Sequence, residues 1–139
     1  MSQPIKKTVN VRLLSTIKHP DSVAETLDIQ TTGELTIKGE QPYLIYEELQ
    51  NEKAVKTTVK LSSDSALILR NGGVKMRLPF VKGELQTGSY DSGYGPMMIT
   101  TNTEQLQFED GKFRVEYELL INEEVVGTYT LELIYTEAN

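Results

Sequence analysis

The sequence predicts an all-β protein, folded as a single antiparallel up-and-down β-barrel of about eight to ten strands. Apolar and polar residues alternate in short runs, the period-2 pattern of half-buried strands. Clusters of Gly, Pro, Asn, Asp and Ser separate these runs at spacings near ten residues, as in sandwiches and barrels. No helical pattern exceeds a turn or two. We favour a barrel because closure removes the exposed edges of an open sheet.

The first part of the chain contains three expected strands, at residues 6–18, 25–37 and 43–48. His19–Pro20 begins a turn, because Pro presets φ and the following Asp and Ser can bond the backbone. A short helix over residues 21–26 is the alternative there. Gly33 interrupts the second strand, which predicts a bulge or a sharp bend.

Residues 54–80 contain three further strands, with turns at 62–65 and 71–73. Asn71–Gly72 between apolar alternations is a strong hairpin signal, because both residues tolerate positive φ. A two-residue turn there, together with an odd-length loop at 63–65, gathers apolar residues on one face: Val55, Val59, Leu61, Leu67, Leu69, Val74, Met76 and Leu78. The opposite face then collects Lys56, Lys60, Arg70, Lys75 and Arg77.

The last part of the chain predicts strands at 84–90, 97–103, 113–121 and 125–136. Residues 106–108 either extend the 97–103 strand or pair separately. Asp110–Gly111 is a hairpin turn, and residues 91–96 form the most Gly-rich loop. We find no internal repeat or linker. The chain is therefore expected to be one domain, 1–139, with frayed ends at 1–4 and 137–139.

Composition excludes several classes of protein. The absence of Cys rules out disulfides and thiolate-based zinc or catalytic sites. A formal net charge of −6 opposes nucleic-acid binding, which needs a basic footprint. No apolar run approaches a membrane span of roughly 20 residues, and none at the N-terminus suggests a signal peptide. We expect a cytoplasmic protein with no nucleic-acid partner, no membrane association and no cofactor.

Several short patterns stand out along the chain: the Y-x-x-Y-E segment at 43–47, Thr57–Lys60, Leu69–Gly72 ahead of a strand ending in Phe80, Gly33, the 90–95 loop and the strand of Tyr117. Together they resemble the YwiB-like family of small bacterial proteins. The resemblance covers nearly the whole chain. It implies a calycin-like (lipocalin-like) barrel and no defined activity. The loop departs from the family, which often has Thr-Pro-Tyr-Gly where this chain has Ser92–Gly95.

Familiar catalytic and metal-binding patterns are missing. His19, the one histidine, stands in a turn without partners of ligand spacing. The serines at 62, 63 and 65 lack a G-x-S-x-G context. Gly93–Gly95 lacks the spacing and the following helix of a phosphate loop. We therefore expect no catalytic residue and no metal site.

Arg70 is the leading candidate for a ligand contact. At the end of its strand it is positioned to turn into the barrel mouth and meet an anionic group, with Glu47 as the expected partner. The alternative is a rim salt bridge worth about 0–1 kcal/mol. Four tyrosines are candidates to line an amphipathic pocket, or else belong to the core: Tyr43, Tyr46, Tyr90 and Tyr94.

These residues support one leading hypothesis and two alternatives. The leading hypothesis is a barrel that binds a small, anionic, amphipathic molecule. The first alternative is an interaction or self-associating module, such as a homodimer. It would use a sheet edge or the basic stripe Lys56, Lys60, Lys75 and Arg77, which is otherwise a solvated outer face. An enzyme is the second alternative, and it needs perturbed titratable residues in a cleft.

Overall fold

The computed structural model describes residues 3–50 and 52–138, and ten antiparallel strands account for most of them. The strands are β1 (Ile5–Lys18), β2 (Glu25–Lys38), β3 (Gln41–Gln50), β4 (Lys53–Lys60), β5 (Ala66–Gly72), β6 (Lys75–Phe80), β7 (Leu85–Asp91), β8 (Pro96–Glu109), β9 (Lys112–Ile121) and β10 (Glu124–Glu137). Within the described chain, the 21–26 segment forms no helix: a turn precedes β2.

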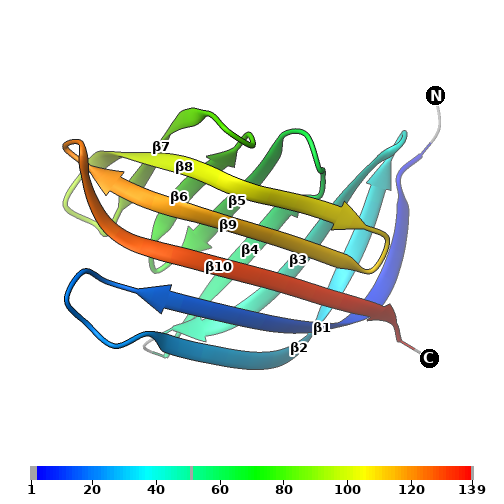
Figure 1. The fold of residues 1–139 in the computed structure, drawn as a ribbon. Helices are drawn as coiled ribbons and strands as arrows, with labels where there is room; N and C mark the ends of the chain where they lie inside the picture. The colour runs from blue at the N-terminus through cyan, green and yellow to red at the C-terminus, as the bar shows by residue number, and fades with distance from the viewer. Residues whose placement is uncertain (1–2, 51, 139) are drawn as a thin grey trace.

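Each strand pairs with its neighbour in sequence, and β1 also pairs with β10, so the sheet closes into an up-and-down barrel. Figure 1 shows the cylinder lying on its side, with both termini at one end. The β1–β2 and β9–β10 hairpins lie at the opposite end. The predicted fold class is confirmed. Each described strand is paired along at least part of both sides, and the shortest ladder is that of β6 with β7, where Lys75–Arg77 pair with Ser89–Asp91.

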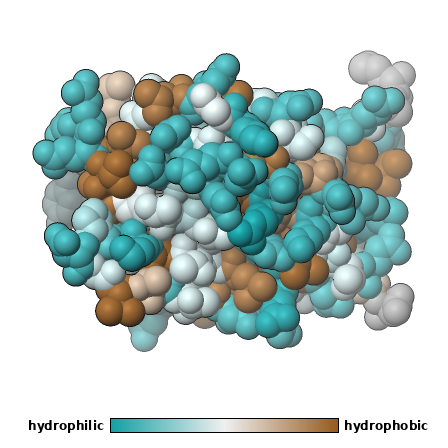
Figure 2. Space-filling model, in the orientation of Figure 1, coloured by the Kyte–Doolittle hydropathy of each residue, from teal (hydrophilic) through white to brown (hydrophobic). Residues whose placement is uncertain are grey.

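The core fills the half of the barrel nearer the termini. Its side chains come from alternate positions of the strands, as the sequence pattern predicts. Leu44, Phe80, Phe113 and Leu133 are fully buried there. Phe80 also packs against Tyr117, with ring centroids 4.7 Å apart. The outer face seen in Figure 2 carries only small, separate hydrophobic groups among hydrophilic residues.

The predicted register of the β5–β6 hairpin is wrong. Asn71 pairs with Lys75, so the connection has three residues rather than two. Consequently Ile68 is buried in the core, whereas Leu69 points outward and is 40% exposed. The neighbouring strand causes this shift: Gly72 pairs with Val55, and a Cβ on Gly72 would lie only 2.2 Å from a backbone oxygen of Ala54.

The rest of the predicted core face in this region follows the shift. Val55, Val59 and Leu61 are buried, as predicted. Leu67 lies on the outer face with Leu69, because residues two apart on a strand share a face. Arg70 leaves the basic stripe and joins the inner face, where it pairs across to Met76.

Two other expected features differ in the structure. Gly33 forms no bulge, because β2 pairs with β1 without a register shift on both sides of it, whereas the pairing of β2 with β3 ends at Gly33. The bulge, one of the two predicted alternatives, is therefore wrong. Gly33 is instead a point of close approach, where a Cβ would lie 2.6 Å from the Ile45 oxygen. At the other end of the chain, Glu137 pairs with Val9 and Ala138 donates a backbone hydrogen bond to Thr8, so these two residues are not frayed. Residues 1, 2 and 139 of the expected frayed ends lie outside the described residues.

Candidate functional site

The barrel mouth contains a cavity of about 400 Å³, at the end away from the termini. This half of the lumen is not filled because its inward residues include small or polar side chains, among them Ser15 and Thr57. The walls are mostly apolar, formed by Leu13, Ile17, Leu27, Ile29, Leu49, Ile68, Met76, Leu78, Leu119 and Leu131. A volume of this size falls within the ~300–1,000 Å³ typical of small-molecule sites.

Polar side chains gather on one wall of this cavity, across three neighbouring strands. Tyr46 of β3 pairs with Thr57 of β4, which pairs with Arg70 of β5. Glu48 lies two residues beyond Tyr46 and therefore faces the same side. Arg70 Nη2 donates to Glu48 Oε1 at 3.0 Å, and the two side chains are only 22% and 13% exposed.

The tyrosines of the cavity are held as neutral phenols. Burial raises the pKa of Tyr46; Glu48 raises it further, while Arg70 and Thr57 act in the opposite direction. Burial likewise raises the pKa of Tyr117, with Arg70 opposing. Tyr117 stacks on Tyr129 with ring centroids 5.1 Å apart, and burial raises the Tyr129 pKa as well. These hydroxyls can therefore donate hydrogen bonds at neutral pH.

The Thr57 hydroxyl is a buried polar group without a hydrogen bond of acceptable geometry within the described chain. It lies beside Tyr46, close enough to lower the Tyr46 pKa. The Thr103 hydroxyl is also buried without a hydrogen-bond partner, but Thr103 does not line the cavity. A buried hydroxyl without a partner costs roughly 1–3 kcal/mol, so the Thr57 site favours a molecule that can bond to it.

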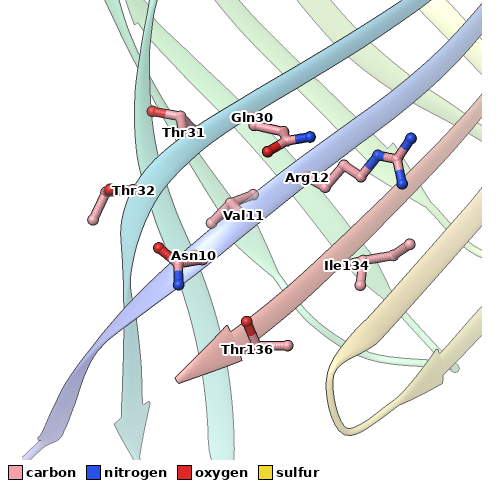
Figure 3. Close-up of a pocket in the computed structure, with 8 residues that line it drawn as sticks. All are labelled: Asn10, Val11, Arg12, Gln30, Thr31, Thr32, Ile134 and Thr136. Atoms are coloured by element: carbon pink, nitrogen blue, oxygen red, sulfur yellow. The ribbon is translucent and has the colours of Figure 1, made fainter. Parts of the chain in front are cut away.

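A second hollow, of about 500 Å³, lies on the outer wall over β1, β2 and β10 (Figure 3). Asn10, Arg12, Gln30 and Thr136 line it, and it is more open than the mouth. Arg12 is held by Asp28 through two hydrogen bonds of 3.1 and 2.8 Å. Most of the residues that line this hollow are polar, whereas the mouth is lined mainly by apolar side chains, so the mouth is the better candidate site.

Comparison with known proteins places the fold and the family. The family described as "Domain of unknown function (DUF1934)" matches residues 11–133. The chain belongs to the DUF1934 family. It is 28% identical over 139 residues to the "Uncharacterized beta-barrel protein YwiB" of Bacillus subtilis (strain 168), covering 97% of this chain and 96% of that protein.

A crystal structure supports the relationship. The ywiB protein from Bacillus subtilis superposes on this DUF1934 barrel with a TM-score of 0.84 and 25% identity, covering 96% of this chain and 94% of that one. The expected family resemblance is confirmed. These relatives are described as uncharacterised or of unknown function, so they assign no activity to the DUF1934 barrel.

The structure brings only part of the predicted ligand set together. Arg70 and Tyr46 line the mouth of the DUF1934 barrel. Tyr90 faces inward and packs against the core, but outside the cavity lining. Tyr43 faces outward, with Lys38 Nζ 5.7 Å from its ring centroid, and Tyr94 is 97% exposed on its loop.

The expected partner of Arg70 was wrong by one residue. The ion pair is made by Glu48, whereas Glu47 is exposed on the outer face. Sequence reasoning also missed Thr57 and Tyr129. The two-residue alternation along β3 would have identified the partner, because a buried Tyr46 places Glu48 inside the barrel and Glu47 outside it.

The predicted basic stripe lies on the outer wall of the DUF1934 barrel. Lys56 and Lys75 flank Asn71 on neighbouring strands, and Arg77 pairs with Leu69 in the next row. Lys60 is half-buried beside them. Among residues 3–50 and 52–138 there is no cluster of three or more potential Asp, Glu or His metal ligands. The same residues include no helix suited to crossing a bilayer.

Proposed function

We propose that this protein binds a small amphipathic molecule in the mouth of its barrel. The observation that carries the proposal is the half-enclosed cavity of about 400 Å³, apolar on most sides and polar on one. Burial of an apolar ligand surface there is worth roughly 25 cal/mol per Å² before the costs of binding. The polar wall of Tyr46, Thr57, Glu48 and Arg70 would fix the orientation of the head group.

The calycin-like relationship and a cytoplasmic location belong to the same proposal. An up-and-down barrel that holds one ligand in its mouth is the arrangement of lipocalins. The location rests on the sequence-based expectation alone.

A cavity-filling variant tests the proposal. Ser15 lines the cavity, so Ser15→Phe would fill part of it while Arg70 and Glu48 stay unsubstituted. Thr16→Phe, on the other face of the same strand, is the matched control. The uncharged fluorophore N-phenylnaphthylamine is the probe, and native mass spectrometry of freshly purified protein looks for a retained ligand.

We expect the probe to bind the unaltered protein and Thr16→Phe equally. Ser15→Phe should weaken binding at least about tenfold, which corresponds to 1.4 kcal/mol. Equal binding by both variants, or no binding by any form, would contradict the proposal. Circular dichroism on each variant verifies that the barrel is folded.

The outer wall supports a second candidate function, docking of an acidic protein segment. The observation behind it is the basic stripe of Lys56, Lys60, Lys75 and Arg77, which surrounds the exposed Leu69. This charge stands out in a chain of net charge −6 and complements an acidic partner. Titration with a glutamate- and leucine-containing peptide tests it, with the four-residue change to Glu as the control. Binding that survives charge reversal would eliminate this candidate.

A further inference from the structure

The cavity presents one positive and one negative charge, side by side. Of the described residues that line it, Arg70 and Glu48 are the only ones of the acidic and basic types Asp, Glu, Lys and Arg. They contact each other at 3.0 Å and are mostly withdrawn from water. The formal charge of the wall is therefore zero. The expectation of an anionic ligand took Glu47 as the partner of Arg70, whereas Glu48 is the carboxylate that contacts Arg70 inside the cavity.

This pairing penalises a charged head group of either sign. A ligand carboxylate that contacts Arg70 also meets the Glu48 carboxylate, and a like charge in a poorly hydrated site is unfavourable. An ammonium group that contacts Glu48 meets the Arg70 guanidinium in the same way. Opening the pair to admit one charge would break the contact between the Arg70 guanidinium and the Glu48 carboxylate, which is costly in a buried site.

An uncharged head with both a donor and an acceptor avoids these penalties. Its acceptor can approach the guanidinium side and its donor the carboxylate side, while the ion pair stays intact. The Thr57 hydroxyl adds a group that can donate or accept, and within the described chain it has no properly aligned partner. A primary amide or a vicinal diol has this chemistry.

We propose that the barrel mouth selects amphipathic molecules with an uncharged head carrying both a donor and an acceptor, over carboxylates or ammonium ions of the same chain length. The juxtaposition of Arg70, Glu48 and Thr57 on one wall carries this inference. It rests on the proposed function, since it names the class of ligand for the same cavity.

Three chain-matched probes test the inference on the unaltered protein: octanamide, octanoate and octylammonium at neutral pH. Nuclear magnetic resonance titrations give the dissociation constant of each. We expect octanamide to bind at least about tenfold more tightly than either ion. Octanoate or octylammonium binding as tightly as octanamide would overturn the inference while leaving the proposed function standing. No binding by any probe, together with failure of the fluorophore test, would overturn both.

A charge-removing variant provides an independent test. Glu48→Gln keeps the shape of the side chain and leaves Arg70 as the single charge of the wall. We expect octanoate to bind this variant at least about tenfold more tightly than the unaltered protein, and more tightly than octanamide. Glu47→Gln, on the outer face of the same strand, should change no affinity. An unchanged octanoate affinity in folded Glu48→Gln would count against the inference.

Discussion

Arg70 and Glu48 form an ion pair inside the mouth of the barrel, with Nη2 and Oε1 3.0 Å apart. The two residues come from strands that are not neighbours, because β4 lies between them. Thr57 of β4 pairs with Arg70 in the sheet and also lines the cavity. The pair therefore connects β3 and β5 across the lumen side of β4, and it supplies the only full charges of the described cavity wall.

Removing one partner of this pair should cost more stability than removing both. Arg70→Met leaves the Glu48 carboxylate poorly hydrated and without its cation. We expect a loss of about 2 kcal/mol, below the ~3–5 kcal/mol of a fully buried pair because both side chains retain some exposure. Arg70→Met with Glu48→Met should recover most of that loss. Urea unfolding of the three forms measures the effect.

The outer pair Arg12–Asp28 is the control for this prediction. It is held by two hydrogen bonds, but both side chains are about half exposed. A double-mutant cycle there should give a weaker coupling than the cycle at Arg70 and Glu48, because solvent screens the charges. If the losses of unfolding free energy in the Arg70 and Glu48 single variants simply added up in the double variant, the two side chains would not be coupled and the prediction would fail.

The fold could be predicted because it depends on local signals repeated along the chain. Alternation and turn residues located all ten strands within a few positions, and the penalty for open edges favoured closure. The β5–β6 register could not be predicted in the same way, because Ala66–Arg70 has apolar residues on both faces of the strand. The choice between Ile68 and Leu69 was made by the contact of Gly72 with β4, which is distant in sequence.

The site was less predictable than the fold, because it depends on which residues face inward. Arg70 was recognised by its chemistry, but its orientation followed from the shifted register. Tyr46 shares the inner face with Glu48, which a strict two-residue repeat would have indicated. The stacking of Tyr117 on Tyr129 joins β9 to β10 and could not be derived without the pairing of those strands.

Gly33 should tolerate no side chain. A Cβ there would lie 2.6 Å from the Ile45 oxygen and 3.0 Å from Val11 Cγ2, so β3 would have to move away from β2. We expect Gly33→Ala to destabilise the barrel by about 1–3 kcal/mol. Gly39→Asn is the control, since Gly39 has open space and a φ of +63° that Asn adopts readily. Equal midpoints of urea unfolding in the two variants would refute this account.

Phe113 should be among the most costly residues to truncate. Its ring is fully buried at the filled end of the barrel. We expect Phe113→Ala to cost about 3–5 kcal/mol through lost burial and a residual cavity. Leu85→Ala is the control, because Leu85 is 64% exposed and its truncation should lie within ~0.5 kcal/mol of zero. If Phe113→Ala lost less free energy of unfolding than an average surface substitution, this end of the barrel would not be the core.

The buried phenols should make the protein less stable in alkali. Burial raises the pKa of Tyr46 and Tyr117 above the ordinary phenol value. A raised folded pKa contributes stability that is complete below about pH 10, and that is lost as the pH rises towards the folded pKa. Each phenol should add up to about 1.4 kcal/mol of lost stability per pH unit in that window. Unfolding curves at about pH 9 and about pH 11 measure how steeply the free energy of unfolding falls with pH. This fall should become smaller in Tyr46→Phe and smaller again when Tyr117→Phe is added. An unchanged fall in the double variant would show that neither phenol resists ionisation.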